Sequence, residues 1–244
     1  MQKVALITGS GKKRIGFHVA KEACKRGYAV ALHYHTSQTE SEASKSELTS
    51  LGYRVSLFQA NLSVETEVKQ MINEVVRTFG RIDLLVTAAS IWPKKKLLET
   101  SAKDVLENFS ANTLSTFLCC KEAGAIMSKQ SDGGSIVTIG DWATERPYCD
   151  YSAYFTSKGS IPTLTRVFAT ELAKLNRKIR VNCILPGPVM IPEGVDPDEV
   201  VSKTVLKRLG SPESISKTVF YFAENDFITG TCLPVDGGRT IFSE

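Results

Sequence analysis

The chain has 244 residues, of which 42% are hydrophobic and 23% charged, and it carries a formal net charge of +4. These values predict one large folded α/β domain spanning residues 1–244 and exclude a disordered or fibrous chain. The mild positive charge comes with no basic tail, zinc finger or aromatic-basic motif, so we expect no nucleic-acid partner.

The first residues, MQKVALITGSG, indicate a strand that runs into a glycine loop and not a signal peptide. No apolar run reaches the roughly 18 residues that a membrane span needs. The cysteines show no CxxC spacing, and most lie in apolar runs, where cysteine usually acts as a small buried hydrophobe. We therefore expect a reduced, cytoplasmic protein without membrane contact. Its cysteines are Cys24, Cys119, Cys120, Cys149, Cys183 and Cys232.

Short apolar segments alternate with longer helical patterns along the chain. These segments are apolar on successive residues, which is typical of parallel strands covered on both faces. Gly27 and Gly80 are placed to end helices, and Ser63 and Ser101 to begin them. The alternation predicts a doubly wound parallel sheet, a Rossmann fold, with about seven strands and helices on both faces. The predicted strands are Val4–Thr8, Ala29–His33, Val55–Gln59, Leu84–Thr87, Ser135–Ile139, Val181–Leu185 and Cys232–Val235.

The loop TGSGKKRIG joins the first predicted strand to the first helix. Glycines in such a turn let backbone N–H groups approach a pyrophosphate, which also lies at the positive end of the helix. Gly9, Gly11 and Gly16 form no strict GxGxxG, so alone they fit a plain strand-to-helix turn equally well. Arg14 stands where such loops often have glycine, and its guanidinium could bind phosphate or a planar substrate.

The second predicted strand ends in ALHYHTSQ, where an NAD-selective site usually has an acid for the ribose 2′-hydroxyl. The nearest acid is Glu40, several residues further on, whereas the strand end and Lys13 are polar or basic. This pattern favours NADPH as the cofactor, with NADH as the alternative. His33 and His35 share one face of the strand end, and without a third ligand nearby we predict no metal site.

The stretch GDWATERPYCDYSAYFTSK holds three tyrosines, and only Tyr154 has a lysine four residues further on. That spacing places Tyr154 and Lys158 one turn apart on the same side of a helix. A phenol with a pKa of about 10 is a poor acid near neutral pH, but a neighbouring ammonium lowers that pKa. The tuned tyrosine can then donate a proton while a hydride arrives at carbon. Pro162 removes a backbone N–H from the same helical pattern, so we expect a local kink there.

With these motifs the chain resembles the short-chain dehydrogenase/reductase family over nearly its whole length. The resemblance rests on YFTSK, TGSGKKRIG, NLS (61–63), TAAS (87–90), SANTL (110–114), PGP (186–188) and ITGTCLPVDGG (228–238). It implies that Tyr154 is the general acid, that Lys158 binds the nicotinamide ribose and lowers the tyrosine pKa, and that Asn112 holds the water of a proton relay. The NLS turn would contact the adenine, and PGP would line the nicotinamide pocket. The implied cofactor-binding residues are Gly9, Gly11, Lys13, Arg14, Ile15, His35, Thr36, Ser37, Asn61, Leu62, Ala88, Ala89, Ser90, Tyr154, Lys158, Pro186, Gly187 and Val189.

Most members of that family have a serine thirteen residues before the tyrosine, and here that residue is Asp141. An aspartate there is similar to the pteridine reductase and dihydromonapterin (dihydrofolate) reductase branch, in which it binds the pterin and feeds protons to the tyrosine. Arg14 and Trp92 fall where that branch has a pterin-facing arginine and a covering aromatic. The resemblance thus implies an NADPH-dependent reductase of a pterin or dihydrofolate-like C=N bond. Its substrate-binding residues would be Arg14, Trp92, Asp141 and Tyr154.

Other interpretations stay open at this point. The same fold serves carbonyl reductases such as 3-oxoacyl-[acyl carrier protein] reductases, for which a serine would be expected at Asp141. The aspartate could also cap a turn, and Trp92 could be a partly buried aromatic beside a loop proline. A sensor without catalysis has no reason to keep Tyr154, Lys158 and Asn112 together. The resemblance further implies a homotetramer or homodimer that acts on a small-molecule substrate.

Overall fold

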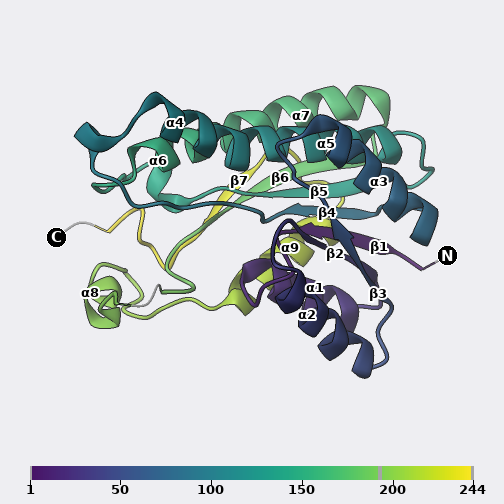
Figure 1. The fold of residues 1–244 in the computed structure, drawn as a ribbon, viewed down its shortest axis with the longest axis horizontal. Helices are drawn as coiled ribbons and strands as arrows, with labels where there is room; N and C mark the ends of the chain where they lie inside the picture. The colour runs from purple at the N-terminus through teal and green to yellow at the C-terminus, as the bar shows by residue number, and fades with distance from the viewer. Residues whose placement is uncertain (1, 192–193, 243–244) are drawn as a thin grey trace.

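The computed structural model describes residues 2–191 and 194–242, which form a parallel sheet flanked by helices (Figure 1). The sheet has seven strands in the order β3-β2-β1-β4-β5-β6-β7, and all neighbouring strands run parallel. The predicted doubly wound Rossmann sheet is therefore confirmed. The strands are β1 Val4–Thr8, β2 Ala29–Tyr34, β3 Val55–Gln59, β4 Leu84–Thr87, β5 Gly134–Ile139, β6 Ile179–Pro186 and β7 Cys232–Val235.

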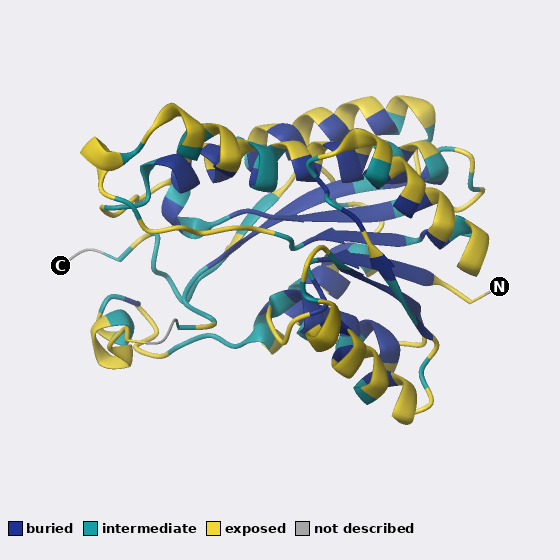
Figure 2. Cartoon of the chain, in the orientation of Figure 1, coloured by how far each residue is buried: buried dark blue, intermediate teal, exposed yellow. Residues whose placement is uncertain are grey.

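Two hydrophobic layers hold the helices to the sheet. One layer packs α3, α5 and α7 on one face, and the other packs α1, α2 and α9 on the opposite face. Figure 2 shows the result: the central strands are dark blue, and the helices of both layers are blue toward the sheet and yellow outside. Among the described residues, no helix combines the length and apolarity that crossing a membrane requires. These helices are α1 Ile15–Lys25, α2 Gln38–Ser50, α3 Glu65–Phe79, α5 Ser115–Met127, α7 Ile161–Leu175 and α9 Pro212–Glu224.

Most of the predicted helix ends agree with the structure. Gly27 and Gly80 follow α1 and α3 with φ values of 81° and 89°, the left-handed conformation that glycine adopts without strain. Ser101 caps α4 (Ala102–Asn108) through a capping box with Asp104. The prediction for Ser63 was wrong: α3 begins at Glu65 after the N-cap residue Val64. The Ser63 hydroxyl instead donates to the carbonyl of residue 110 at 3.1 Å.

Two long helical patterns of the sequence are interrupted in the structure. The pattern at 101–127 contains a π-helical turn, Phe109–Leu114, between α4 and α5, and π-turns inside helices often mark functional sites. The predicted kink at Pro162 is a break between two helices. The first, α6 (Ser152–Gly159), ends before it, and Pro162 lies in the first turn of α7, where its missing N–H costs no helical hydrogen bond. Both interruptions lie beside the carboxyl ends of the strands.

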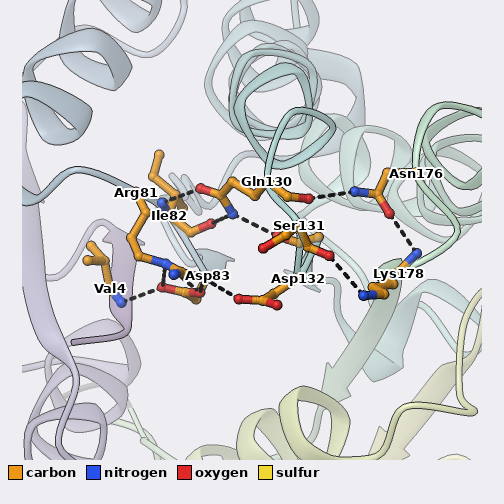
Figure 3. Close-up of polar contacts among 10 residues, drawn as sticks. Val4, Arg81, Ile82, Asp83, Gln130, Ser131, Asp132, Asn176 and Lys178 are labelled. Carbon is orange, nitrogen blue, oxygen red and sulfur yellow. Dashed lines mark hydrogen bonds and ion pairs between the residues drawn. The ribbon is translucent and has the colours of Figure 1, made fainter. Parts of the chain in front are cut away.

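A polar network ties the opposite, amino ends of the strands together (Figure 3). The Val4 N–H donates to the Asp83 carboxylate at 2.8 Å. The Gln130 side chain accepts from the Ile82 N–H at 3.0 Å and donates to the Ile82 carbonyl at 2.8 Å, and Asn176 donates to the Gln130 carbonyl at 2.8 Å. This network satisfies backbone groups at that edge. The candidate active site lies at the other edge, where α6 and the short helix α8 (Pro197–Ser202) are both found in Figure 1.

Candidate active site

Tyr154 and Asp141 meet just beyond the carboxyl end of β5. Tyr154 lies in the first turn of α6 and donates its hydroxyl proton to Oδ2 of Asp141 at 2.7 Å. The other carboxylate oxygen accepts the Ala143 N–H at 2.8 Å and so caps the 3₁₀ turn Trp142–Thr144. The capping role that the sequence left open is therefore present, and the same carboxylate also holds the tyrosine.

The protonation of both groups is shifted by their surroundings. The pKa of Tyr154 is raised, first because burial disfavours the phenolate. The negative charge of Asp141 raises this pKa further because it repels the phenolate, and so does the hydrogen bond that the neutral phenol donates to Asp141. Burial also raises the pKa of Asp141, against the opposing hydrogen bonds from Ala143 and Tyr154 and the charge of Lys158. The lowered tyrosine pKa expected from the sequence is therefore wrong for this arrangement, because the phenol is buried and its hydroxyl faces a carboxylate and not an ammonium.

Lys158 lies one helical turn beyond Tyr154 and is almost completely buried, with 4% of its surface exposed. Its ammonium donates to the carbonyl of Ile139, the last residue of β5, at 2.8 Å. Burial lowers the pKa of Lys158, and attraction to Asp141 opposes that change. The lysine is thus fixed at the carboxyl end of β5, on the same side of α6 as the tyrosine. Its predicted role on a nicotinamide ribose stays a prediction.

Asn112 sits in the π-helical turn and joins β4's carboxyl end to α6. Its side-chain oxygen accepts from the Ile91 N–H at 2.9 Å and the Ser90 hydroxyl at 3.0 Å. Its side-chain amide donates to the Ser157 hydroxyl at 2.9 Å and to the Ile91 carbonyl at 3.2 Å. Because protein groups occupy both ends of this side chain, the structure shows a bracing role, and the predicted proton relay stays a prediction.

Aromatic rings border the tyrosine hydroxyl. Trp92, 41% exposed, stacks on Tyr151 with ring centroids 4.9 Å apart and an angle of 15° between the planes. The Tyr154 ring lies 6.3 Å from Trp92, and Tyr148 meets Tyr151 edge to face at 5.3 Å. Trp92 was predicted from the sequence, whereas Tyr148 and Tyr151 were passed over for lack of a nearby lysine. Their closeness to Tyr154 in the chain was the available signal.

The structure does not place Arg14 in contact with the aromatic and acidic residues around Tyr154. Arg14 is the N-cap residue of α1 with an exposed side chain, and no hydrogen bond or ion pair between described residues joins it to Asp141, Trp92 or Tyr154. The side chain at the start of α1 is well placed for the phosphate role that the sequence also allowed. Its substrate role stays a prediction.

The glycine loop packs tightly against neighbouring backbone, which suits a dinucleotide. Gly9 has a φ of 63°, and a Cβ on it would lie 2.6 Å from the Cα of Ala89. A Cβ on Gly16 would lie 2.8 Å from the Gly9 carbonyl oxygen. The first turn of α1, starting at Ile15, has neither a capping side chain nor an acidic residue, so its N–H groups and positive dipole suit a pyrophosphate. These residues fit the diphosphate of NAD(P)H. When bound, that cofactor would supply the hydride.

His33 supports the loop from behind. It is buried, its Nδ1 accepts the Gly9 N–H at 3.0 Å, and its Nε2 lies 3.0 Å from the Ala60 carbonyl oxygen. Burial lowers the pKa of His33 to about 4, so the ring is neutral near pH 7 and Nε2 carries the proton that Ala60 accepts. Both ring nitrogens are thus committed to backbone groups. Lys13, predicted to bind the cofactor, forms an ion pair with Glu47 of α2 at 2.8 Å.

A hollow of about 580 Å³ lies at the predicted adenine end of the site. Asn61 forms a turn there by accepting the Ser63 N–H at 3.1 Å, and Leu62 is buried beneath it. Thr36 and Ser37 lie between β2 and α2, and Ser37 is the N-cap residue of α2 without a side-chain capping bond. The hollow is lined by His35, Asn61, Ser63, Ile91, Lys103, Leu106, Glu107, Ser110 and Ala111.

The PGP segment lies where β6 and β7 end. Pro186 is the last residue of β6, and the Gly187 N–H donates to the carbonyl of Val235 at 3.0 Å. A Cβ on Gly187 would lie 2.4 Å from the Cα of Asp236, so only glycine fits there. Val189 packs on the hydrophobic layer of α1 and α9. The segment thus lies at the same edge of the sheet as the glycine loop, Ala88 and Ala89.

A parallel sheet with a glycine loop at a helix N-terminus, and a buried tyrosine–lysine pair at the same edge, define a dinucleotide-dependent oxidoreductase. The family described as enoyl-(acyl carrier protein) reductase matches residues 9–240. A short-chain dehydrogenase/reductase of Armillaria gallica is 34% identical over 97% of this chain and 95% of its own length. A 3-oxoacyl-[acyl-carrier-protein] reductase of Homo sapiens is 32% identical over 98% of both chains.

A dehydrogenase/reductase crystal structure from Sinorhizobium meliloti 1021 superimposes with a TM-score of 0.89 and 32% identity, over 97% of this chain and 94% of that one. The chain therefore belongs to the short-chain dehydrogenase/reductase family, and its class is an NAD(P)-dependent oxidoreductase. The relatives named here favour the carbonyl reductase alternative over the pterin reductase interpretation, because one of them is itself a 3-oxoacyl-[acyl-carrier-protein] reductase.

Proposed function

We propose that this enzyme is an NADPH-dependent reductase of a C=N bond in a planar nitrogen heterocycle of the pterin or dihydrofolate kind, with Tyr154 as the general acid. The observation that carries the proposal is the 2.7 Å hydrogen bond between Tyr154 and Asp141. It places a carboxyl group where most members of the family have a serine, next to the proton that the reaction needs.

A carboxylate at this position discriminates between substrates by charge. Reduction of a ketone builds negative charge on oxygen, which the Asp141 carboxylate would repel, whereas a heterocycle with N–H groups can donate to that carboxylate. The exposed indole of Trp92 offers a flat aromatic surface beside the tyrosine, and flat rings pack well on such surfaces. Both features suit a planar substrate that carries hydrogen-bond donors.

Tyr154 and Asp141 can together deliver the proton that the reaction consumes. Tyr154 would donate its proton to the substrate nitrogen as hydride arrives at the neighbouring carbon, and the phenolate would be held near buried Lys158. Burial raises the pKa of Asp141, so this carboxyl group takes up a proton more readily than an exposed one and can return it to the tyrosine. Asp141 would then both orient the substrate and return a proton to the Tyr154 phenolate.

NADPH is the proposed cofactor because no acid lies at the end of β2, and the nearest, Glu40, is paired with Lys12 at 3.2 Å. His35, Thr36 and Ser37 leave this end polar and without negative charge. An extra phosphate on the ribose would meet hydrogen-bond donors there instead of a carboxylate. A homodimer or homotetramer remains our expectation for the assembled enzyme.

A carbonyl reductase of the 3-oxoacyl-[acyl carrier protein] kind is the second candidate. It is supported by the match to the human 3-oxoacyl-[acyl-carrier-protein] reductase over 98% of both chains. In that case Asp141 would have to act in its protonated form and donate a hydrogen bond to the carbonyl oxygen. Its raised pKa makes this form more accessible than for an exposed aspartate.

One comparison separates the candidates: NADPH consumption with dihydrobiopterin, dihydromonapterin, dihydrofolate and acetoacetyl thioesters, measured side by side. We expect turnover of a pterin-type substrate, and a loss of about tenfold to a hundredfold in kcat/KM for it in Asp141→Ser, as removal of a charged hydrogen bond costs. Asp141→Ser should improve turnover of the thioester. Glu145→Ser, which removes a nearby exposed acid, is the matched control and should change neither. Wild-type enzyme that reduces the thioester and leaves every pterin untouched would overturn the first candidate and support the second.

A further inference from the structure

Two cysteines face each other across the strands β6 and β7. Cys183 and Cys232 are register partners in this parallel pair, and partners on neighbouring strands project their side chains to the same face. Neighbouring strands lie about 4.8 Å apart. That spacing falls within the roughly 4.4–6.8 Å between Cα atoms that disulfides span. The backbone is therefore already at the separation a disulfide requires.

The surroundings of the two thiols differ. Cys183 is fully buried in a small apolar cluster with Ile161 and Leu185, whereas Cys232 is only partly buried. The Cys232 sulfur lies 3.9 Å from the carbonyl oxygen of Pro162, so the pair faces the start of α7. A small oxidant from solvent would meet Cys232 first, with Cys183 directly behind it.

The pKa shifts of the two thiols also favour Cys232 as the sulfur that reacts first. The neighbouring Cys183 thiol, and then the charge of Arg166, lower the pKa of Cys232 to about 7 although partial burial opposes this. The contact with Cys232 and burial raise the pKa of Cys183 well above its ordinary value. The accessible sulfur is thus the more easily deprotonated of the two, and the thiolate is the reactive form.

We propose that Cys232 and Cys183 form an oxidation site in which Cys232 reacts with hydrogen peroxide and Cys183 closes a disulfide. The Cys232 thiolate attacks a peroxide oxygen, the O–O bond breaks, and the departing hydroxide takes a proton to become water, which leaves a sulfenic acid. The Cys183 sulfur then attacks the Cys232 sulfur, the S–O bond breaks, and the hydroxyl leaves as water with the Cys183 proton. Two thiols are oxidised to one disulfide, and one hydrogen peroxide is reduced to two waters.

The remaining cysteines lack this arrangement. Cys24, Cys119 and Cys120 are buried in helices, and burial raises the pKa of each. Cys149 is exposed but has no cysteine as a strand partner in the described part of the chain. It therefore serves as the internal control for general thiol oxidation.

The test is disulfide mapping on the full-length enzyme. The protein is exposed to hydrogen peroxide, free thiols are blocked with N-ethylmaleimide, and protease digests are read by mass spectrometry. We expect one intramolecular cross-link between the peptides of Cys183 and Cys232, with loss of two hydrogens, together with loss of Cys232 labelling that dithiothreitol reverses. Cys232→Ser should abolish the cross-link, and Cys149→Ser should leave it unchanged.

The wild-type result decides the question even if a variant at buried Cys183 does not fold. Where Cys183→Ser folds, Cys232 should stop at the sulfenic acid or oxidise further, because the closing thiol is absent. Cys232 that stays fully open to maleimide after peroxide, or that reaches sulfinic acid in the wild type without a cross-link to Cys183, would overturn the proposal. So would a wild-type disulfide that joins Cys183 or Cys232 to a different cysteine in place of the other member of the pair.

Discussion

Replacing Tyr154 with phenylalanine removes one oxygen atom and keeps the ring that packs beside Trp92. The lost hydroxyl is the proton donor of the proposed reaction, and a positioned general acid contributes about a hundredfold to ten-thousandfold to rate. The change also leaves Oδ2 of Asp141 without its 2.7 Å hydrogen bond, which should cost about 1–3 kcal/mol where water cannot replace it. We therefore expect kcat for the proposed pterin-type substrate to fall at least about a hundredfold. NADPH binding, followed by its fluorescence, should change little.

Tyr151→Phe is the matched control for this variant. Tyr151 precedes α6, stacks on Trp92 and lies three residues from Tyr154, but no described hydrogen bond joins it to Asp141. Its loss of a hydroxyl should leave kcat within about threefold, because the stacked ring remains. A Tyr154→Phe enzyme that keeps most of its kcat, or a Tyr151→Phe enzyme that loses as much, would refute the assignment of the proton to Tyr154.

Two further predictions concern stability. The pKa of His33 is about 4 in the folded protein against an ordinary value of 6.5, so between these values the unfolded chain binds more protons. The free energy of unfolding should therefore fall by a few kcal/mol as the pH drops through this range. Urea unfolding at pH 7 and pH 5 should show a smaller fall for His33→Gln than for the wild type. An equal fall in both proteins would contradict this prediction. Gln130→Leu removes hydrogen bonds to Ile82 at the edge away from the active site (Figure 3). The free energy of unfolding should drop by about 1–3 kcal/mol with kcat unchanged, and a loss of kcat in the folded variant would argue against a purely structural role.

The sheet could be predicted from the sequence because its strands are covered on both faces. Val4–Thr8, Val55–Gln59 and Leu84–Thr87 are mostly apolar runs that each follow a charged residue, and the structure gives them the same bounds. β6 is longer than predicted, because its pairing with β5 continues through Ile179 and Arg180. The charged Arg180 separates buried Ile179 from the apolar run that starts at Val181, so the hydrophobic pattern ended short of the paired segment.

The active-site contacts were predictable only where they follow helical spacing. Tyr154 and Lys158 are one turn apart by geometry alone, whereas Asp141 reaches Tyr154 across a turn and a loop. That loop includes Asp150 with a φ of 72°, a conformation that residues other than glycine adopt only where the surrounding structure holds them. The stacking of Trp92 on Tyr151 likewise joins segments far apart in the sequence. Such contacts depend on how the loops pack, which local patterns do not contain.

The charge of Asp141 acts on Lys158 as well as on Tyr154, and its effect on the lysine gives the aspartate a role in the free enzyme. Lys158 is buried, its ammonium has only the Ile139 carbonyl oxygen as a hydrogen-bond partner among the residues that the structure describes, and burial lowers its pKa. The nearby Asp141 charge works in the other direction and helps to keep the ammonium protonated, while Lys158 in turn opposes the rise in the pKa of Asp141. A serine in place of Asp141 would remove that compensation and leave the buried cation alone until a substrate or nucleotide arrived. The charge that Asp141 contributes therefore stabilises the free enzyme's lysine, and it would be neutralised or paired whenever a donor-bearing substrate binds.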